Sequence, residues 1–142
     1  MTRHKPRFIA HRGWSKHFPE NSLPALAAGV AAGADEIEFD LRLSKDGVPV
    51  LCHDSEADRV SNLAGPCSSY TVKELKNADI RMPNGTFVPN LGFSSVDEAF
   101  DTFGGLLGMN IHIKDSHKTA EILAYIVERY DLAKYPDVYI AG

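Results

Sequence analysis

Residues 36–43 read EIEFDLRL, in which polar and apolar side chains alternate over the whole stretch. Successive side chains of a β-strand point to opposite faces of the sheet, so this pattern predicts a strand with two unlike faces. The apolar face would carry Ile37, Phe39 and Leu41. The polar face would carry Glu36, Glu38, Asp40 and Arg42. Because a strand under helices is apolar on the covered side, the polar face is expected to look into something wet or ionic.

The segment at residues 107–114 shows the same alternation. Ile111 and Ile113 would share one face, and the other face would carry Asn110, His112 and Lys114. Two carboxylates at i and i+2, such as Glu38 and Asp40, lie ~7 Å apart along a strand and can converge on one cation. A bound cation would also relieve their mutual repulsion.

Strand-like and helix-like segments alternate along the rest of the chain, which favours an α/β protein with a parallel sheet. Further strands are predicted at residues 7–11, 48–52 and 138–141, and helices at 22–33, 71–77, 95–103 and 119–130. The inward faces of the first and last helices are expected to hold Leu23, Leu26, Ala27, Val30 and Ala31, and Leu123, Ile126, Val127 and Tyr130, respectively. Residues 55–92 are less regular, with a proline-rich loop at 83–89, and so long an excursion is more often functional than a plain connection.

The composition is that of an ordinary soluble globular domain, with 142 residues of which 44% are hydrophobic and 24% charged. The net charge of −4 gives no reason to expect a nucleic-acid partner. No apolar run approaches the ~20 residues of a membrane span, and the first residues lack the apolar core of a signal peptide, so a cytoplasmic protein is expected. Cys52 is expected to be a buried thiol, and Asn84-Gly85-Thr86 a turn.

Side chains suited to acid–base and metal chemistry lie near the C-terminal ends of the extended segments, where (βα) barrels build active sites. They are His11, Glu38, Asp40, His53 and His112. Two histidines can divide general-base and general-acid work near neutral pH. Arg12 can hold a phosphate with paired N–H donors, and Lys114 can add positive charge. Together these groups indicate phosphoryl-ester chemistry.

Each of these residues taken alone has a plain structural explanation. A single histidine at a strand end is usually a satisfied polar residue, and we interpret His4, His17 and His117 in this way. An isolated Glu-x-Asp is most often a solvated edge, an isolated Arg12 a surface ion pair, and Lys114 alone a surface lysine. The joint placement favours the functional interpretation, because independent surface residues have no reason to gather at strand ends.

The order of short motifs resembles that of the glycerophosphodiester phosphodiesterase family. The family's elements His-Arg-Gly, Pro-Glu-Asn-Ser/Thr, Gly-Ala-Asp, Glu-x-Asp, Lys-Asp-Gly and His-Asp occur here in that order. They stand at residues 11–13, 19–22, 33–35, 38–40, 45–47 and 53–54. Weaker features continue with Arg59, Glu74-Leu75, residues 88–91 and Asn110-x-x-x-Lys114. The resemblance covers essentially the whole chain, but only the first half of the family's fold.

The resemblance implies a (βα)8 TIM barrel, of which residues 1–142 would supply about the first four βα units. The stretch at about 55–92 would be an insertion over the barrel mouth that helps to recognise the glycerol end of the substrate. The implied activity is metal-dependent hydrolysis of a small-molecule glycerophosphodiester to glycerol 3-phosphate and an alcohol such as choline or ethanolamine.

The resemblance also implies roles for individual residues. His11 and His53 would be the catalytic acid–base pair, and Arg12 and Lys114 would neutralise the substrate phosphate. The ligands of a divalent cation, usually Mg²⁺ or Ca²⁺, would be Glu38 and Asp40. The first loop and the helix cap would be fixed by Glu20 and Asn21.

One residue departs from the family pattern. The family strand commonly reads Asn-Ile-Glu-Ile-Lys, and the glutamate, which completes the metal site, is replaced here by His112. Imidazole suits Mg²⁺ or Ca²⁺ less well than oxygen does, and suits Mn²⁺, Fe²⁺ or Zn²⁺ better. Three interpretations follow: His112 binds a softer metal, His112 binds phosphate while water replaces the carboxylate, or the site is weakened. We favour a place for His112 among the metal ligands.

The second departure is length, since a (βα)8 barrel typically needs ~250 residues. Half a barrel exposes sheet edges and apolar surface. The chain is therefore expected to be a fragment of a longer coding sequence, a degenerate product, or a half-barrel that associates with a copy of itself, and we favour the fragment.

Two other functions compete with hydrolysis. A phospholipase-type lyase on the same barrel would use a substrate hydroxyl as nucleophile and release a cyclic phosphate. An inactive truncated domain would bind phosphate or a partner without turnover.

Overall fold

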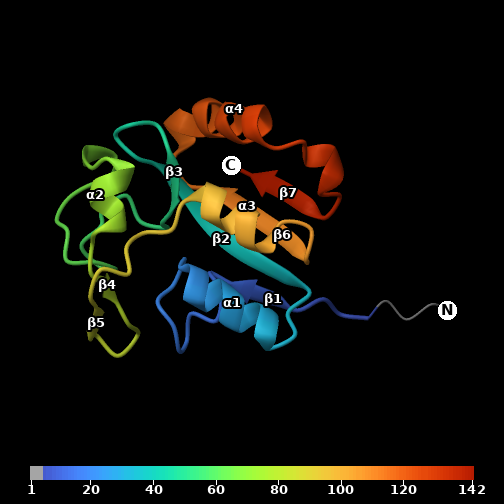
Figure 1. Cartoon of the computed structure of the whole chain (residues 1–142), viewed down its shortest axis with the longest axis horizontal. Helices are drawn as coiled ribbons and strands as arrows, with labels where there is room; N and C mark the ends of the chain where they lie inside the picture. Colours follow the sequence, from blue (N-terminus) through green and yellow to red (C-terminus); the bar gives the residue numbers. More distant parts are fainter. Residues whose placement is uncertain (1–4) are drawn as a thin grey trace.

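The structure is a computed structural model that describes residues 5–142, so the interpretation of His4 lies outside the described residues. Within this range the parallel strands of the main sheet lie in the order β1 (Ile9–His11), β2 (Glu36–Leu43), β6 (Gly108–Ile113) and β7 (Val138–Ala141) (Figure 1). Strands that follow one another in this set are neighbours in the sheet, as in a singly wound barrel, whereas the order of a doubly wound sheet reverses. The predicted α/β class with a parallel sheet is confirmed.

A short antiparallel strand, β3 (Pro49–Leu51), continues the sheet beyond the end of β1. It pairs with the C-terminal part of β2, with Leu41 opposite Leu51. The turn that joins the two strands contains Gly47 at a φ of 80°, a conformation that favours glycine. After β3 the backbone N–H of Cys52 donates to the carbonyl of Asp40. This pairing brings the segment that carries His53 to the carboxyl end of β2.

Three helices, α1 (Leu23–Ala31), α3 (Val96–Phe103) and α4 (Thr119–Arg129), cover the apolar face of the described sheet. The main core lies between them and the strands. Its strand side chains are Ile37, Phe39 and Leu41 from β2 and Met109, Ile111 and Ile113 from β6. The apolar faces predicted for the two strands are therefore confirmed, and the opposite face is left to the polar side chains.

Local capping explains where the helices begin. Ser22 accepts a hydrogen bond from the backbone of Ala25 at the start of α1. Ser95 and Glu98 form the predicted capping box before α3. A second capping box, between Thr71 and Glu74, begins α2 (Val72–Lys76). Each box satisfies backbone N–H groups that the first helical turn leaves without partners.

The predicted inward faces of two helices are partly wrong. In α1, Ala27 and Ala31 are exposed, and the buried residues are Ala25, Leu26 and Gly29. The helix is turned because it packs closely on β1: a Cβ at Gly29 would lie 2.6 Å from that of Ala10.

In α4, Val127 is 61% exposed, whereas Ile126 is buried together with Ile122, which the prediction missed. Ile122 and Ile126 are four residues apart and share one stripe of the helix. Val127 lies about 100° further round, outside that stripe.

Residues 55–92 pack against the end of β3 around a second core, to which residues on both sides of this stretch contribute. Leu75 of α2 and Phe93 lie in this core with Cys52 and Cys67, whose sulfur atoms are 3.5 Å apart. The burial predicted for Cys52 is confirmed. The predicted proline-rich loop at 83–89 is wrong in part, because β4 (Ile80–Arg81) and β5 (Phe87–Val88) pair in an antiparallel hairpin. The turn predicted at Asn84-Gly85-Thr86 joins these two strands.

The remaining described elements are single turns of 3₁₀-helix, η1 (Cys67–Ser69), η2 (Ser116–Lys118) and η3 (Leu132–Lys134). Among residues 5–142, no helix combines the length and apolar character that crossing a bilayer requires.

Gly13, in the loop after β1, is expected to be essential for stability. It has a φ of 77°, and an added Cβ would lie 2.4 Å from the backbone carbon of Ala25. Gly13→Ala should lower the free energy of unfolding by ~3 kcal/mol, because left-handed strain costs ~1–2 kcal/mol and overpacking ~1–3 kcal/mol. Equilibrium unfolding in urea would measure this loss of stability.

Gly33 provides the matched control, because its φ is 87° but an added Cβ would have no heavy atom within 4 Å. Gly33→Ala should therefore lose only the conformational share, ~1–2 kcal/mol. Equal losses in the two variants would contradict the close approach of the first loop to α1.

Candidate active site

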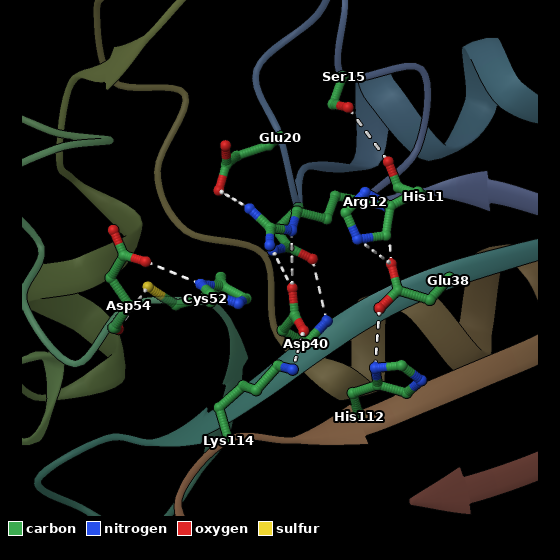
Figure 2. A network of polar contacts seen from close by, with 12 residues as sticks. His11, Arg12, Ser15, Glu20, Glu38, Asp40, Cys52, Asp54, His112 and Lys114 are labelled. Atoms are coloured by element: carbon green, nitrogen blue, oxygen red, sulfur yellow. Dashed lines mark hydrogen bonds and ion pairs between the residues drawn. The ribbon is translucent and has the colours of Figure 1, made fainter.

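The polar face of the sheet gathers ionisable side chains at the carboxyl ends of β1, β2 and β6 (Figure 2). Glu38 and Asp40 are only 2% and 1% exposed, so they do not lie on a solvated edge. Burying two carboxylates is unfavourable unless positive charge or hydrogen-bond donors compensate them. The environment that the sequence predicts to be wet or ionic is therefore ionic, and the compensating groups define the site.

Three side chains have the composition and spacing of a metal site. One ligand atom from each of Glu38, Asp40 and His112 lies within 4.8 Å of the others. Glu38 Oε1 is buried and forms no hydrogen bond with the described residues, although His112 Nδ1 lies 3.3 Å away as a possible ion pair. An uncompensated carboxylate oxygen beside a second carboxylate and an imidazole fits a divalent cation, and the imidazole favours the softer ones.

The second oxygen of Glu38 faces the first loop. Its Oε2 accepts a hydrogen bond of 2.8 Å from the backbone N–H of Arg12. His11 Nε2 lies 3.9 Å from the same oxygen, and the His11 side chain is 66% exposed. His11 is thus held next to the carboxylate pair with its ring accessible to a ligand.

Asp40 is compensated by the two residues predicted to bind phosphate. Arg12 Nε lies 3.2 Å from Asp40 Oδ2, as an ion pair without hydrogen-bond geometry, and Lys114 Nζ lies 3.5 Å from Oδ1. Asn21 donates through Nδ2 to Asp40 Oδ2 and accepts the Asp40 backbone N–H, each at 3.0 Å. Asn21 therefore clamps Asp40, whereas the capping role falls to Ser22.

The first loop reaches this arrangement in an unusual backbone conformation. Arg12 and Asn21 have φ values of 54° and 53°, a region that non-glycine residues seldom adopt. The backbone N–H of Asn21 donates to the carbonyl of Arg12, which closes the loop between them. This closure points both side chains at Asp40.

His53 lies on the segment after β3, outside the group formed by Glu38, Asp40 and His112. Its Nδ1 is 2.8 Å from Asp54 Oδ1. The hydrogen bond from Arg59 to Asp54, stronger than the opposing effect of burial, lowers the pKa of Asp54 to about 2. Asp54 is therefore a carboxylate at neutral pH, so Nδ1 of a neutral His53 carries the proton and Nε2 is left as an acceptor.

A chain of ion pairs connects His53 with the first loop. Arg59 contacts Asp54 and Glu20, and Glu20 contacts Arg12. The structure thus joins six of the predicted residues, His11, Arg12, Glu38, Asp40, His112 and Lys114, by direct contacts, and His53 through this chain. The sequence interpretation missed the part played by Arg59 and Asp54, and the motif His53-Asp54 was the available signal.

Comparisons with known proteins identify relatives of this chain. A family model described as the glycerophosphoryl diester phosphodiesterase family matches residues 11–138. The glycerophosphodiester phosphodiesterase of Caldanaerobacter subterraneus subsp. tengcongensis is 37% identical over 111 residues, which are 78% of this chain and 46% of that protein. The enzyme of the same name from Bacillus altitudinis is 40% identical over 73 residues, or 51% of this chain and 30% of that protein.

Solved structures of similar fold are also found. The glycerophosphoryl diester phosphodiesterase of Parabacteroides distasonis is 31% identical with a TM-score of 0.81, covering 99% of this chain and 48% of that chain. A phosphodiesterase of Oleispira antarctica, crystallised with its product sn-glycerol-3-phosphate, is 23% identical with a TM-score of 0.73, covering 95% of this chain and 64% of that chain. The match with the curated relatives spans less than half of their length.

Proposed function

Because the chain belongs to the glycerophosphoryl diester phosphodiesterase family, we propose that it carries the catalytic half of an enzyme that hydrolyses glycerophosphodiesters with the help of a divalent cation. The products would be sn-glycerol 3-phosphate and an alcohol. The observation that carries this proposal is the buried carboxylate pair of Glu38 and Asp40, which meets His112 at the carboxyl end of the sheet.

The residues that would hold the cation are Glu38, Asp40 and His112. When bound there, a divalent cation would supply positive charge to a phosphate oxygen and make a water molecule more acidic. The cation proposed from the sequence is retained: Mg²⁺ or Ca²⁺ first, with Mn²⁺ or Zn²⁺ as the alternatives that His112 introduces. Glu38 Oε1 has no hydrogen-bond partner among the described residues, and this oxygen and the nearby imidazole of His112 support a cation at this position.

Proton transfer is assigned to His11 and His53. Hydrolysis of a phosphodiester forms a bond between water oxygen and phosphorus and breaks the bond from phosphorus to the alcohol oxygen. One imidazole would take the proton from water, and the other would give a proton to the departing alcohol. Asp54 supports this role for His53, because it leaves the Nε2 lone pair of the neutral ring directed away from the carboxylate.

Phosphate binding is assigned to Arg12 and Lys114. Both cations face the carboxylate of Asp40, so a substrate phosphate would add a second anion on their far side. A cation bound by Asp40 would at the same time reduce the hold of the carboxylate on these side chains. Substrate and metal would therefore support each other's binding.

The barrel itself is also a proposal. We propose that the described parallel strands are the first part of a (βα)8 barrel and that residues 55–92 lie over its mouth, where they help to recognise the glycerol end. Association with a second copy of the chain, a further part of the same coding sequence and a cytoplasmic location stay predictions.

Activity of the chain on glycerophosphocholine in the presence of Mg²⁺, Ca²⁺ or Mn²⁺ tests the proposal. Release of sn-glycerol 3-phosphate, followed by a coupled assay, is the expected result. Phosphorus NMR of the same reaction would separate the alternatives, because a persistent cyclic phosphate would replace hydrolysis with the lyase reaction. Absence of any product while phosphate still binds would favour the inactive domain.

A further inference from the structure

Arg59 contacts both ends of the site at once, although it lies in the inserted region. Its Nε donates to Asp54 Oδ2 at 2.5 Å. Its two terminal nitrogens donate to the two oxygens of Glu20, Nη1 to Oε2 at 2.9 Å and Nη2 to Oε1 at 2.7 Å. Each of the three guanidinium nitrogens therefore donates to one of two carboxylates.

Each of those carboxylates makes a second contact with a residue of the proposed site. Asp54 Oδ1 lies 2.8 Å from His53 Nδ1. Glu20 Oε1 accepts from Arg12 Nη1 at 3.2 Å, as drawn in Figure 2. The path His53–Asp54–Arg59–Glu20–Arg12 thus connects one imidazole of the acid–base pair with the guanidinium assigned to phosphate.

We propose that Arg59 is a positioning residue that fixes His53 through Asp54 and Arg12 through Glu20 at the same time. This proposal rests on the proposed function, in which His53 moves a proton and Arg12 binds the phosphate. Among the described residues, Arg59 forms its hydrogen bonds and ion pairs with Asp54 and Glu20 and none with His53 or Arg12. Its effect is to set the distance and orientation between the proton carrier and the phosphate site.

The residue type at position 59 follows from this geometry. An arginine presents its donors in a rigid planar fork that matches a carboxylate with two parallel hydrogen bonds, and a further donor remains for another acceptor. A lysine ammonium has one nitrogen and cannot bridge the same three oxygens in fixed directions. The Arg59 side chain is half exposed, so a single ion pair would contribute little. A bidentate contact within a network is the exception.

The charge states of the two carboxylates are consistent with a persistent bridge. Burial alone raises the pKa of Glu20, but the hydrogen bond and charge of Arg59 and the charge of Arg12 together lower it. Both carboxylates therefore stay ionised at neutral pH and keep Arg59 between them. Loss of Arg59 would leave two neighbouring anions without their shared partner, and both would be free to turn toward water.

Arg59→Met and Arg59→Lys test the proposal in the full chain, with Arg129→Met as the matched control. Arg129 is an exposed arginine of α4 that stacks on Tyr125, outside the path. Imidazole NMR, without metal or substrate, reports which ring nitrogen of His53 carries the proton, and the His53→Gln spectrum assigns the signal. We expect the Nδ1–H form in the parent chain and in Arg129→Met, and a mixture of tautomers in Arg59→Met.

Kinetics provide the second measurement. Arg59→Met should lower kcat/KM by ~10–100-fold, by analogy with the loss when hydrogen-bonding partners that orient metal ligands are removed, and Arg59→Lys should recover little of it. Added guanidinium ion should restore part of the rate of Arg59→Met and none in Arg129→Met. Unfolding curves recorded for each variant identify any that fails to fold. If Arg59→Met does not fold, Arg59→Lys is used in its place, because it keeps the charge and the approximate length of the side chain.

The outcomes separate this proposal from the proposed function. A parent chain without turnover would count against the function alone, and the tautomer measurement would still decide the role of Arg59. Retention of the Nδ1–H form of His53 in Arg59→Met would overturn the proposal. Parent-like kcat/KM in Arg59→Lys would also overturn it, because charge without the fork would then suffice.

Discussion

Replacement of His53 by alanine is expected to lower kcat by ~10²–10⁴-fold, because proton transfer by a positioned side chain contributes that much. The ring is 34% exposed and makes its ion-pair contact with Asp54, so its removal should leave the fold intact. His11→Ala should have a loss of the same order, since its imidazole stands beside Glu38 at the opposite side of the site.

The measurement is the rate of sn-glycerol 3-phosphate release at saturating substrate. His117→Ala is the control, because His117 is an exposed histidine on η2 with no hydrogen bond or ion pair to the carboxylate pair. Its kcat should equal that of the parent chain. A loss smaller than ~10-fold in His53→Ala would remove the acid–base role from this residue. Unchanged unfolding curves would show that lost activity does not come from lost structure.

The strands of the sheet and their apolar faces could be predicted from the sequence, because the patterns that indicate them lie within short stretches of the chain. The alternation of polar and apolar residues in 36–43 and 107–114 predicts which side chains face the helices, and both strands have the predicted apolar faces. The capping box of Ser95 and Glu98 is likewise contained within four consecutive residues. Patterns of this kind are independent of the rest of the chain.

Other features depend on contacts between segments that are distant in the sequence. A local pattern of residue types cannot predict such contacts. Arg59 and Glu20 are 39 residues apart, and only the folded chain brings them together. The turned face of α1 follows from how closely Gly29 approaches β1, and the exposure of Val127 from which stripe of α4 meets the sheet. The β4–β5 hairpin is two short strands around prolines, too brief for a periodic signal.

The candidate site could be predicted from the sequence only in part. The residue types and their positions at strand ends predicted one constellation that included Glu38, Asp40 and His112, and the family resemblance then singled these three out as metal ligands. Their ligand atoms do lie close together. The sequence could not reveal that both carboxylates are almost fully buried, or that Arg12 and Lys114 face Asp40. Burial and charge pairing are properties of several strands at once, and they exclude the solvated edge that an isolated Glu-x-Asp would suggest.

Glu38→Gln is expected to abolish most cation binding and, with it, ~10³-fold of the activity, because a metal ion contributes several kcal/mol to stabilising transition-state charge. Glutamine has the same shape and can still accept the backbone N–H of Arg12, so the first loop should keep its place. Titration calorimetry with Mn²⁺ measures the binding directly, without substrate. Glu121→Gln, an exposed glutamate on α4, provides the control for loss of one negative charge.

The companion variant His112→Glu tests which cation this chain selects. A third carboxylate would replace an imidazole, so affinity for the hard cations Mg²⁺ and Ca²⁺ should rise relative to that for Zn²⁺. Because the new carboxylate would stand beside Glu38 and Asp40, repulsion should also lower the stability of the cation-free form. Calorimetry in parallel with Mg²⁺ and Zn²⁺ compares the two preferences. An unchanged preference would place His112 outside the metal ligands, and equal binding by Glu38→Gln and the parent would remove the cation from this site altogether.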